Sequence, residues 1–300
     1  MLFRSAVADG LPADAYDFKL DVKFFNGNQL ISMPSSRLAD PITFRFADFR
    51  TKLEVNSLGD DARGNPKLYL PARGISYAIQ GTTGNDILHA GPGHDFIKGD
   101  QGNDSLDGGM GDDTLQGGAG ADTLEGGTGN NTASYEDATS GVSIELASNL
   151  NNNTSKTSFG IANGDVLKQI QNLIGGTGDD QLVGNQEVNL LVGGLGNDTL
   201  EGEKGPDTLN GGDGTDTVSF EHAASGVRVD LQNTANNLGD DATGDVYLSI
   251  ENIVGSAYAD DLRGDEKDNT IQGGLGDDTL EGGLGKDYLD GGSSTNDLNN

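Results

Sequence analysis

A nine-residue pattern dominates this 300-residue chain. Five units follow one another over residues 81–125, each close to Gly-Gly-x-Gly-x-Asp-x-U-x, in which U is a large aliphatic residue. Position 8 of these units is occupied in turn by Leu88, Ile97, Leu106, Leu115 and Leu124. A unit this short cannot bury its apolar side chain alone, so the register predicts coils that stack into a solenoid.

The glycines and the aspartate divide each unit into a six-residue turn and a three-residue strand. Glycine at positions 1, 2 and 4 permits φ > 0, which residues with side chains avoid. A turn that tight points its carbonyl oxygens inward, and the aspartate at position 6 adds carboxylate oxygens at its end. Ca²⁺ takes roughly six to eight ligands of this hard oxygen type. We therefore expect the turns to bind calcium.

Alternate units fall on the same side of a two-unit coil, so the turns of units n and n+2 stack about 4.8 Å apart. Shared sites are expected between Asp86 and Asp104, between Asp104 and Asp122, and between Asp95 and Asp113. Across the chain, the position-6 aspartates expected to bind metal are Asp86, Asp95, Asp104, Asp113, Asp122, Asp180, Asp198, Asp207, Asp216, Asp260, Asp278 and Asp287.

Two longer segments interrupt the nonapeptides and are similar to each other. Residues 134–146 and 219–231 share one pattern of alternating apolar residues, and residues 164–175 and 244–255 share a second. Repeated spacers of this kind predict ordered, wider coils. We expect six segments: a small β-rich segment at 1–80, calcium-binding β-roll blocks at 81–133, 175–218 and 255–300, and structured spacer coils at 134–174 and 219–254.

Some units depart from the pattern at positions that matter for metal binding. Asparagine replaces the position-6 aspartate in three units, at Asn131, Asn189 and Asn269. Glu187 and Lys267 stand where position 4 should be glycine. We expect weaker or empty sites at these turns. The unit of Asp260 also lacks that glycine, because Tyr258 occupies its position 4.

Charge is distributed unevenly along the chain. The formal net charge is −30; residues 81–300 carry 39 acidic and 8 basic residues, whereas residues 1–80 carry 9 and 10. Such an acidic body repels nucleic acid and anionic lipid, so its natural partners are cations. Glycine and proline make up about 18% of the chain, below the roughly 25–30% of low-complexity sequences. Together with the fixed register, this argues against a flexible linker.

Residues 1–80 differ from the repeats in composition. They hold 10 of the 17 aromatic residues but only 5 of the 48 glycines. Period-two alternation predicts strands at 18–24, 42–46 and 52–55, and the Asn26-Gly27 pair predicts a hairpin. The segment contains no histidine or cysteine and no recognisable catalytic constellation.

The repeats resemble the hemolysin-type calcium-binding repeats of RTX (repeats-in-toxin) proteins over residues 81–300. The resemblance rests on about a dozen units and on the two repeated spacers. It implies an all-β, right-handed parallel β-roll with Ca²⁺ as cofactor between stacked turns. It also implies a secreted, extracellular bacterial protein, exported by type I secretion machinery that reads an uncleaved C-terminal signal. Residues 291–300 continue the repeat composition and hold no separate segment of that kind.

Other features of the composition agree with export and with folding that depends on calcium. Residues 1–10 lack the apolar stretch of a signal peptide, and no run of about 18 apolar residues predicts a transmembrane helix. The chain has no cysteine, so bound metal is one way to stabilise it outside the cell. Each unit buries one aliphatic side chain, and the carboxylates repel one another without a cation. We expect calcium binding to drive folding, with a loose chain inside the cell and a rigid one outside.

Enzymatic motifs are absent from the sequence. The chain's three histidines, His89, His94 and His222, are not spaced as His-Glu-x-x-His, and neither a Gly-x-Ser-x-Gly elbow nor an EF-hand loop occurs. Acid pairs such as Asp112-Asp113 recur with the repeat, so we interpret them as a ligand and an exposed neighbour. We expect a non-catalytic calcium-binding module for secretion, stability or adhesion. The alternatives are the repeat part of a secreted RTX protease, lipase or polysaccharide-modifying enzyme, and a cell-surface or ice-facing solenoid.

Overall fold

The computed structural model describes residues 76–146 and 160–293 in full, and six short strands elsewhere by their backbone. The chain forms two compact units, Met1–Asn131 and Thr132–Asn300. In the described residues, both consist mainly of short β-strands joined by turns. Within the described residues no helix is long and apolar enough to cross a membrane.

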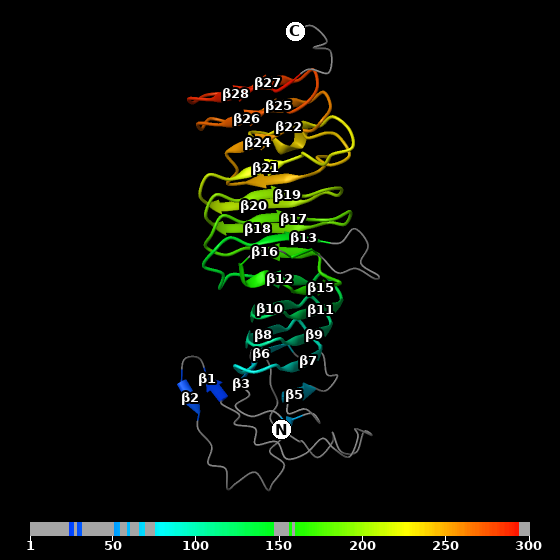
Figure 1. Ribbon diagram of the computed structural model, residues 1–300, viewed down its shortest axis with the longest axis vertical. Helices are drawn as coiled ribbons and strands as arrows, with labels where there is room; N and C mark the ends of the chain where they lie inside the picture. Colours follow the sequence, from blue (N-terminus) through cyan, green and yellow to red (C-terminus); the bar gives the residue numbers. More distant parts are fainter. Residues whose placement is uncertain are drawn as a thin grey trace. The chain divides into compact units, whose positions relative to one another are not determined.

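The first unit is a roll of two sheets whose repeat strands are parallel (Figure 1). One sheet has the order β10 (Thr114–Ala119), β8 (Phe96–Gln101), β6 (Tyr77–Gln80) and β3 (Thr51–Glu54). The other has the order β11 (Thr123–Thr128), β9 (Ser105–Met110), β7 (Ile87–Pro92), β5 (Pro66–Tyr69) and β4 (Gly59–Asp60). Leu115 pairs with Ile97, one coil of two units away.

Strands before the first nonapeptide join the same sheets. β3 pairs in parallel with β6, and β5 pairs in parallel with β7, whereas β4 and β5 are antiparallel. β1 (Phe24–Asn26) and β2 (Gln29–Ile31) form an antiparallel pair, in agreement with the hairpin predicted at Asn26-Gly27. Strand β3 overlaps the strand predicted at 52–55. The strand predicted at 42–46, and most of that at 18–24, lie outside the described residues.

The second unit contains three sheets. The first comprises β23 (Val246–Leu248), β20 (Thr208–Asp213), β18 (Leu190–Leu195), β16 (Asn172–Ile174) and β12 (Thr132–Ser134). The second comprises β14 (Lys156–Thr157), β13 (Ser143–Glu145), β17 (Gln181–Val183), β19 (Thr199–Glu201), β21 (Thr217–Ser219), β24 (Asn252–Val254), β26 (Thr270–Gln272) and β28 (Tyr288–Asp290). The third comprises β22 (Arg228–Asp230), β25 (Asp261–Arg263) and β27 (Thr279–Glu281).

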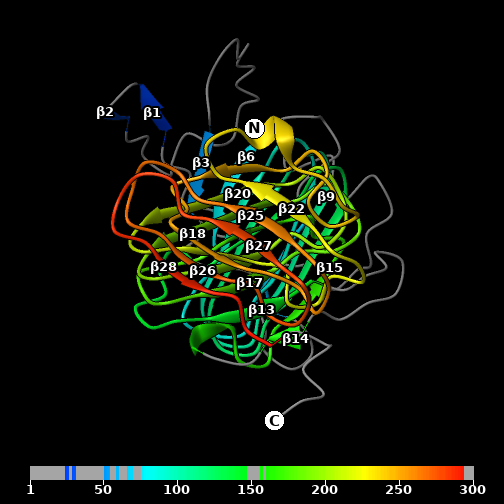
Figure 2. The ribbon, with the colours of Figure 1, turned by 90° about the horizontal axis from the view of Figure 1, so that it is seen from above.

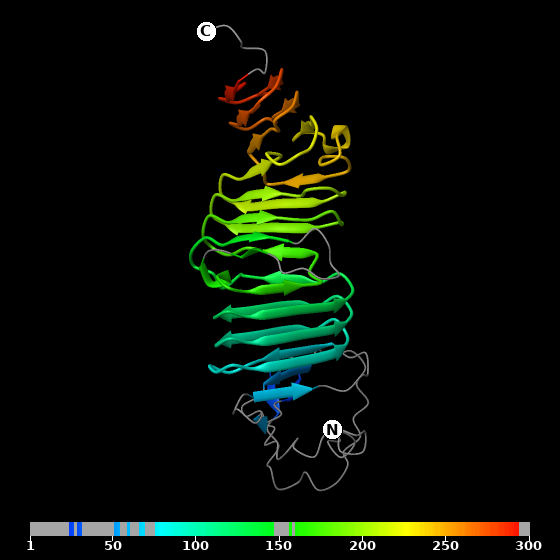
Figure 3. The same cartoon turned by 45° about the vertical axis from the view of Figure 1, so that its right-hand side comes forward.

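Successive coils of the second unit lie over one another. Figure 3 shows the strands of residues 172–219 as evenly stacked ribbons, and Figure 2, which looks along the stack, shows β25 beside β27 and β26 beside β28. These pairs are parallel, and only β13 and β14 are antiparallel among the paired strands described in this unit. The predicted all-β, parallel β-roll is confirmed.

Position 8 of the repeat forms the core. Leu88, Ile97, Leu106, Leu115 and Leu124 have no exposed surface. Most of the corresponding residues of the second unit are equally buried: Leu182, Leu191, Leu200, Leu209, Val218, Leu262 and Ile271. In the last described coil Leu280 is half-buried and Leu289 is 44% exposed. Because each coil contains two units, these side chains form two narrow files of aliphatic residues, one from each sheet, as with Leu106 on β9 and Leu115 on β10.

The described parts of both spacers are ordered, as their internal repetition predicts. Val142 and Ile144 in the first spacer and Val227 and Val229 in the second are buried, on or beside β13 and β22. The spacers also contain two short 3₁₀ turns, η2 (Gly160–Ala162) and η3 (Thr234–Asn236), and strand β15 (Val166–Lys168). Residues 147–155 lie outside the described part, and the six-segment division remains a prediction.

Candidate metal centre

Position-6 carboxylates form columns along the first unit. The backbone N–H of Asp86 donates to Oδ1 of Asp104 over 2.8 Å, and the N–H of Asp104 donates to Oδ1 of Asp122 over 2.7 Å. On the other column, the N–H of Asp95 donates to Oδ1 of Asp113 over 2.8 Å. The residue pairs expected to share sites therefore lie on directly stacked turns.

The second unit repeats this arrangement. The N–H of each residue donates to Oδ1 of the aspartate 18 positions later in five pairs: Asp180–Asp198, Asp198–Asp216 and Asn189–Asp207 at 2.8 Å, and Asp260–Asp278 and Asn269–Asp287 at 3.0 Å. One carboxylate oxygen thus fixes the turn to the preceding turn. The other oxygen is left for a different partner.

That second oxygen is buried and unpaired in many turns. Oδ2 has no hydrogen-bond partner in Asp95, Asp104, Asp113, Asp198, Asp207, Asp216 and Asp278. Buried polar atoms are normally hydrogen-bonded, because an unpaired group bears the full cost of leaving water. For an ionised carboxylate this cost is especially high unless a cation is close. These oxygens therefore fit the ligand role that was predicted for the aspartates.

Glycine at position 1 leaves room beside this oxygen. A Cβ atom on Gly99 would clash with Oδ2 of Asp104 and lie 2.5 Å from the carbonyl oxygen of Gly117. The φ angle of Gly81 is not positive, nor is that of Gly99. The expectation that position 1 uses the left-handed region is therefore wrong. Glycine is needed there because the turn has no space for a side chain.

In the turns of Asp104 and Asp198, glycine at position 4 is needed both for its positive φ and for lack of space. Gly102 has φ +122°, and a Cβ atom there would lie 2.6 Å from the carbonyl oxygen of Gly84. Gly196 has φ +124°, and its Cβ atom would lie 2.5 Å from the carbonyl oxygen of Gly178. Carbonyl oxygens of one turn therefore point at the next turn of the column. With the carboxylates they form an all-oxygen donor set, which suits Ca²⁺.

The turns adopt two conformations. We call a turn closed when the N–H of its position-2 residue donates to the position-6 side chain. Closed turns are those of Thr82 and Asp86 (2.6 Å), Gly176 and Asp180 (2.7 Å), Asn185 and Asn189 (2.7 Å), Ser256 and Asp260 (2.7 Å), and Asp265 and Asn269 (2.9 Å). In these turns neither position 2 nor position 4 has a positive φ.

We call a turn open when its position-2 residue has a positive φ. The open turns with a position-6 aspartate are those of Asp95, Asp104, Asp113, Asp122, Asp198, Asp207, Asp216, Asp278 and Asp287. Asp100 and Glu203 adopt this conformation at position 2 without being glycine, with φ of 79° and 65°. Every unpaired Oδ2 of a position-6 aspartate belongs to an open turn. The backbone conformation therefore decides whether the aspartate closes its own turn or presents an oxygen.

Burial changes the acidity of these carboxyls. It raises the pKa of Asp104, Asp198 and Asp207 to about 7, and that of Asp113 to about 6. Repulsion between stacked carboxylates adds to this effect, as for Asp104 between Asp86 and Asp122. Both causes disfavour the ionised form, and a bound cation would offset both.

Asparagine at position 6 supplies an amide donor where aspartate supplies an anion. Nδ2 of Asn189 donates to the carbonyl oxygen of Gln171 over 2.6 Å, and Nδ2 of Asn269 donates to that of Glu251 over 2.7 Å. Both asparagines lie in closed turns. Each amide nitrogen hydrogen-bonds to the carbonyl oxygen of the residue 18 positions earlier. This agrees with the prediction of weak or empty sites there, which stays a prediction.

Two acidic residues that the nonapeptide pattern misses also occupy position-6 places. The N–H of Asp207 donates to Oδ1 of Asp245 over 2.9 Å, and the N–H of Asp216 donates to Oε2 of Glu251 over 3.0 Å. Both acids belong to the second spacer, 38 and 35 residues further along. One sequence signal could have identified Asp245: it follows Gly244 and directly precedes the short strand β23.

The histidine rings lie beside acidic side chains or accept backbone hydrogen bonds. Nδ1 of His89 lies 2.7 Å from Oδ2 of Asp107, and Nδ1 of His222 lies 2.9 Å from Oε2 of Glu201. His94 accepts the N–H of the residue 18 positions later at Nδ1. In the part of the chain that the structure describes, no three His, Cys, Asp or Glu side chains are grouped to hold a metal ion.

The fold and the stacked oxygens define a class of calcium-binding β-solenoid. The RTX calcium-binding nonapeptide repeat (4 copies) matches residues 80–115, 98–133, 171–200, 192–221, 254–289 and 263–298, which together span half of the chain. The chain belongs to this family, and its repeats bind Ca²⁺. No curated protein matches it.

Proposed function

We propose that Ca²⁺ binds at the open turns, held by position-6 carboxylates and by carbonyl oxygens of the stacked turns. The proposed carboxylate ligands are Asp95, Asp104, Asp113, Asp122, Asp198, Asp207, Asp216, Asp278 and Asp287. The observation that carries this proposal is the buried, unpaired Oδ2 of seven of them: Asp95, Asp104, Asp113, Asp198, Asp207, Asp216 and Asp278. The bound ion would supply positive charge that neutralises the carboxylates and links consecutive turns.

Asp86, Asp180 and Asp260 have a different role in this proposal. Their Oδ2 atoms accept the N–H of the position-2 residue of their own turn. In Asp86 and Asp260 a Thr or Ser hydroxyl donates to the same carboxylate as well. These carboxylates are already satisfied by the protein. We infer that they close the first turns of their columns and contribute less to calcium affinity than the open-turn aspartates.

Calcium binding is proposed to drive the folding of the roll. The core consists of one aliphatic residue per nine, while the columns bring many carboxylates together. Without a cation, the repulsion and the lost hydration of these groups oppose the folded state. Metal binding that requires the folded geometry therefore contributes its free energy to folding.

The biological role that follows is that of a non-catalytic, extracellular module. Extracellular calcium-binding modules have dissociation constants of roughly 10⁻⁴–10⁻³ M, so such sites stay empty in the cytosol. The chain would remain loose before export and become rigid outside, where it could support secretion, stability or adhesion. Type I export machinery is the proposed partner in secretion.

A calcium titration of the full chain tests both parts of the proposal. Far-ultraviolet circular dichroism should show strand formation as calcium rises, and loss of that signal on addition of a chelator. Magnesium at equal concentration is the control, since Mg²⁺ gives up its water ligands reluctantly. A strand signal that survives chelation would refute calcium-driven folding. A titration midpoint at or below about 10⁻⁷ M, the lower end for cytosolic sensors, would refute folding confined to the outside.

A further inference from the structure

The second spacer supplies a turn that replaces a nonapeptide turn next to Asp207. The N–H of Asp207 donates to Oδ1 of Asp245 over 2.9 Å, the same bond that joins stacked turns elsewhere. The strand that follows, β23, pairs in parallel with β20, with Tyr247 opposite Leu209. Residues 239–245 therefore form the next turn of this column, although their spacing does not follow the nonapeptide.

Two carboxylate oxygens at this spacer turn are buried and unpaired. They are Oδ2 of Asp207, a residue with no exposed surface, and Oδ1 of Asp241, which is 6% exposed. Asp245 is 1% exposed. Burial raises the pKa of Asp207 and of Asp245, and repulsion from Asp245 and from Asp241, respectively, adds to this effect. Asp241 and Asp245 belong to the same turn, which is bonded to Asp207.

The positive charge of Lys204 acts on this group without forming an ion pair with it, and it partly counteracts the rise that burial causes in the pKa of Asp241. Among the described residues, no basic side chain forms an ion pair with Asp207, Asp241 or Asp245. Lys204, which belongs to the same turn as Asp207, pairs instead with Oδ2 of Asp240 at 3.1 Å. Three buried carboxyls without a paired cation are unfavourable unless they bind one.

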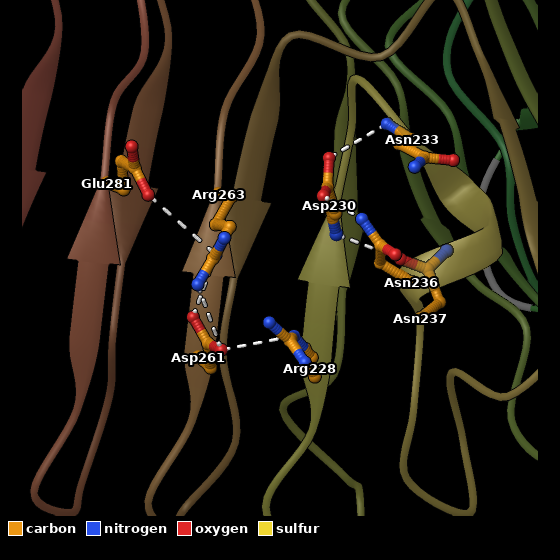
Figure 4. Close-up of polar contacts among 8 residues, drawn as sticks. All are labelled: Arg228, Asp230, Asn233, Asn236, Asn237, Asp261, Arg263 and Glu281. Atoms are coloured by element: carbon orange, nitrogen blue, oxygen red, sulfur yellow. Dashed lines mark hydrogen bonds and ion pairs between the residues drawn. The ribbon is translucent and has the colours of Figure 1, made fainter.

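A network after β22 fixes the backbone of the spacer turn. Figure 4 shows three asparagines gathered around Asp230. Oδ1 of Asp230 accepts the N–H of Asn233 over 2.8 Å, and Oδ2 accepts Nδ2 of Asn236 over 2.7 Å. The N–H of Asp230 donates to Oδ1 of Asn237 over 2.8 Å, and Nδ2 of Asn237 donates to the carbonyl oxygen of Asp245 over 3.2 Å. In the folded chain this network holds the backbone of Asp245.

We propose that Asp207, Asp241 and Asp245 form an additional Ca²⁺ site at the spacer turn 239–245, outside the nonapeptide pattern. The three side chains do not form a cage by themselves, so carbonyl oxygens of the two turns complete the ligand set. This inference rests on the proposed function in one respect: it takes the turn of Asp207 to be a calcium-binding turn. It adds ligands that the repeat alone does not provide.

Counting bound ions tests the site. Native mass spectrometry of the full chain at saturating calcium should show one ion fewer for Asp241→Asn and for Asp245→Asn than for the unmodified chain. Asp240→Asn is the matched control, because it removes the same charge from the adjacent residue, whose side chain is 70% exposed. That variant should keep every ion. An unchanged count in Asp241→Asn would overturn the site while leaving the repeat sites intact.

A second measurement does not depend on a carboxylate variant. The hydroxyl of Tyr247 donates to Oδ2 of Asp245 over 3.2 Å, so Tb³⁺ bound there in place of Ca²⁺ should be excited through this tyrosine. Tyr247→Phe should lower tyrosine-excited terbium emission more than Tyr288→Phe, which alters a residue that is 61% exposed. Equal losses would overturn the site. Failure of the unmodified chain to bind any calcium would instead overturn the proposed function.

Discussion

Nζ of Lys267 lies 2.6 Å from Oε1 of Glu251, which places an ammonium group beside the stacked acids of the second unit. Glu251 occupies the position-6 place after Asp216, because the N–H of Asp216 donates to its Oε2. Burial raises the pKa of Asp216, and the charge of Lys267 partly counteracts this. Lys267 stands where the repeat has its position-4 glycine. At this column, the departure from the pattern supplies a built-in cation.

Removal of this ammonium group should allow an additional metal ion to bind. In Lys267→Met, the carboxylates of Glu251 and Asp216 lose their ammonium neighbour, so we expect one additional Ca²⁺ at saturation, counted by native mass spectrometry. Lys286→Met removes the same charge from an exposed lysine of the following turn and should leave the count unchanged. An unchanged count in both variants, with a loss of about 1 kcal/mol or less in stability, would mean that Lys267 forms only a surface ion pair.

The two acids of the pair Asp112-Asp113 should differ in their effect on calcium binding. Asp113→Asn keeps the Oδ1 that accepts the N–H of Asp95 but replaces the buried, unpaired Oδ2 with an amide nitrogen. We expect the loss of one ion, and at tenfold excess of calcium over its dissociation constant a loss of about 1.4 kcal/mol in stability. Calorimetric titration and calcium-dependent thermal melts measure both quantities. Asp112→Asn, at an exposed side chain, is the control, and equal effects of the two variants would contradict the ligand role.

Position-4 glycines should differ in their tolerance of alanine according to turn conformation. Gly102→Ala forces a side chain into φ +122° and against the carbonyl group of Gly84, so we expect at least about 1–2 kcal/mol of destabilisation at saturating calcium. Gly84→Ala alters the same position of the preceding turn, where the nearest atom, Oγ1 of Thr82, would lie 3.8 Å away. That control should melt within a few degrees of the unmodified chain. A similar loss in both variants would show that the distinction between open and closed turns has no energetic consequence.

The sequence predicted those features that one unit determines by itself. The aliphatic side chain at position 8 and the aspartate at position 6 recur every nine residues, so the burial of Leu106 and the stacking of Asp86 with Asp104 follow from the period. The β-roll follows as well, because parallel stacking is how so short a unit buries its apolar residue.

Features that depend on the neighbouring coil could not be predicted in this way. Asp86 and Asp104 occupy equivalent positions, yet Asp86 closes its own turn and Asp104 presents a free oxygen. The difference lies in the backbone at position 2, where Asp100 is left-handed and Thr82 is not. The role of Asp245 likewise depends on strand pairing between residues 38 positions apart, which the nonapeptide register does not encode.

The stacked carboxyls should make calcium binding dependent on pH. Burial raises the pKa of Asp104, Asp198 and Asp207 to about 7, so below that pH calcium must displace protons, and its affinity should fall by up to about tenfold per pH unit for each proton displaced. A pKa raised above its unfolded value means that protonation favours the folded chain. Without calcium, stability should therefore be greatest below about pH 4 and be lost as the pH rises through about 7. Circular dichroism in calcium and in chelator, from about pH 5 to about pH 8, measures both trends. A calcium midpoint that is constant across this range, or a calcium-free strand signal that grows with pH, would contradict the burial of ionisable carboxyls in the columns.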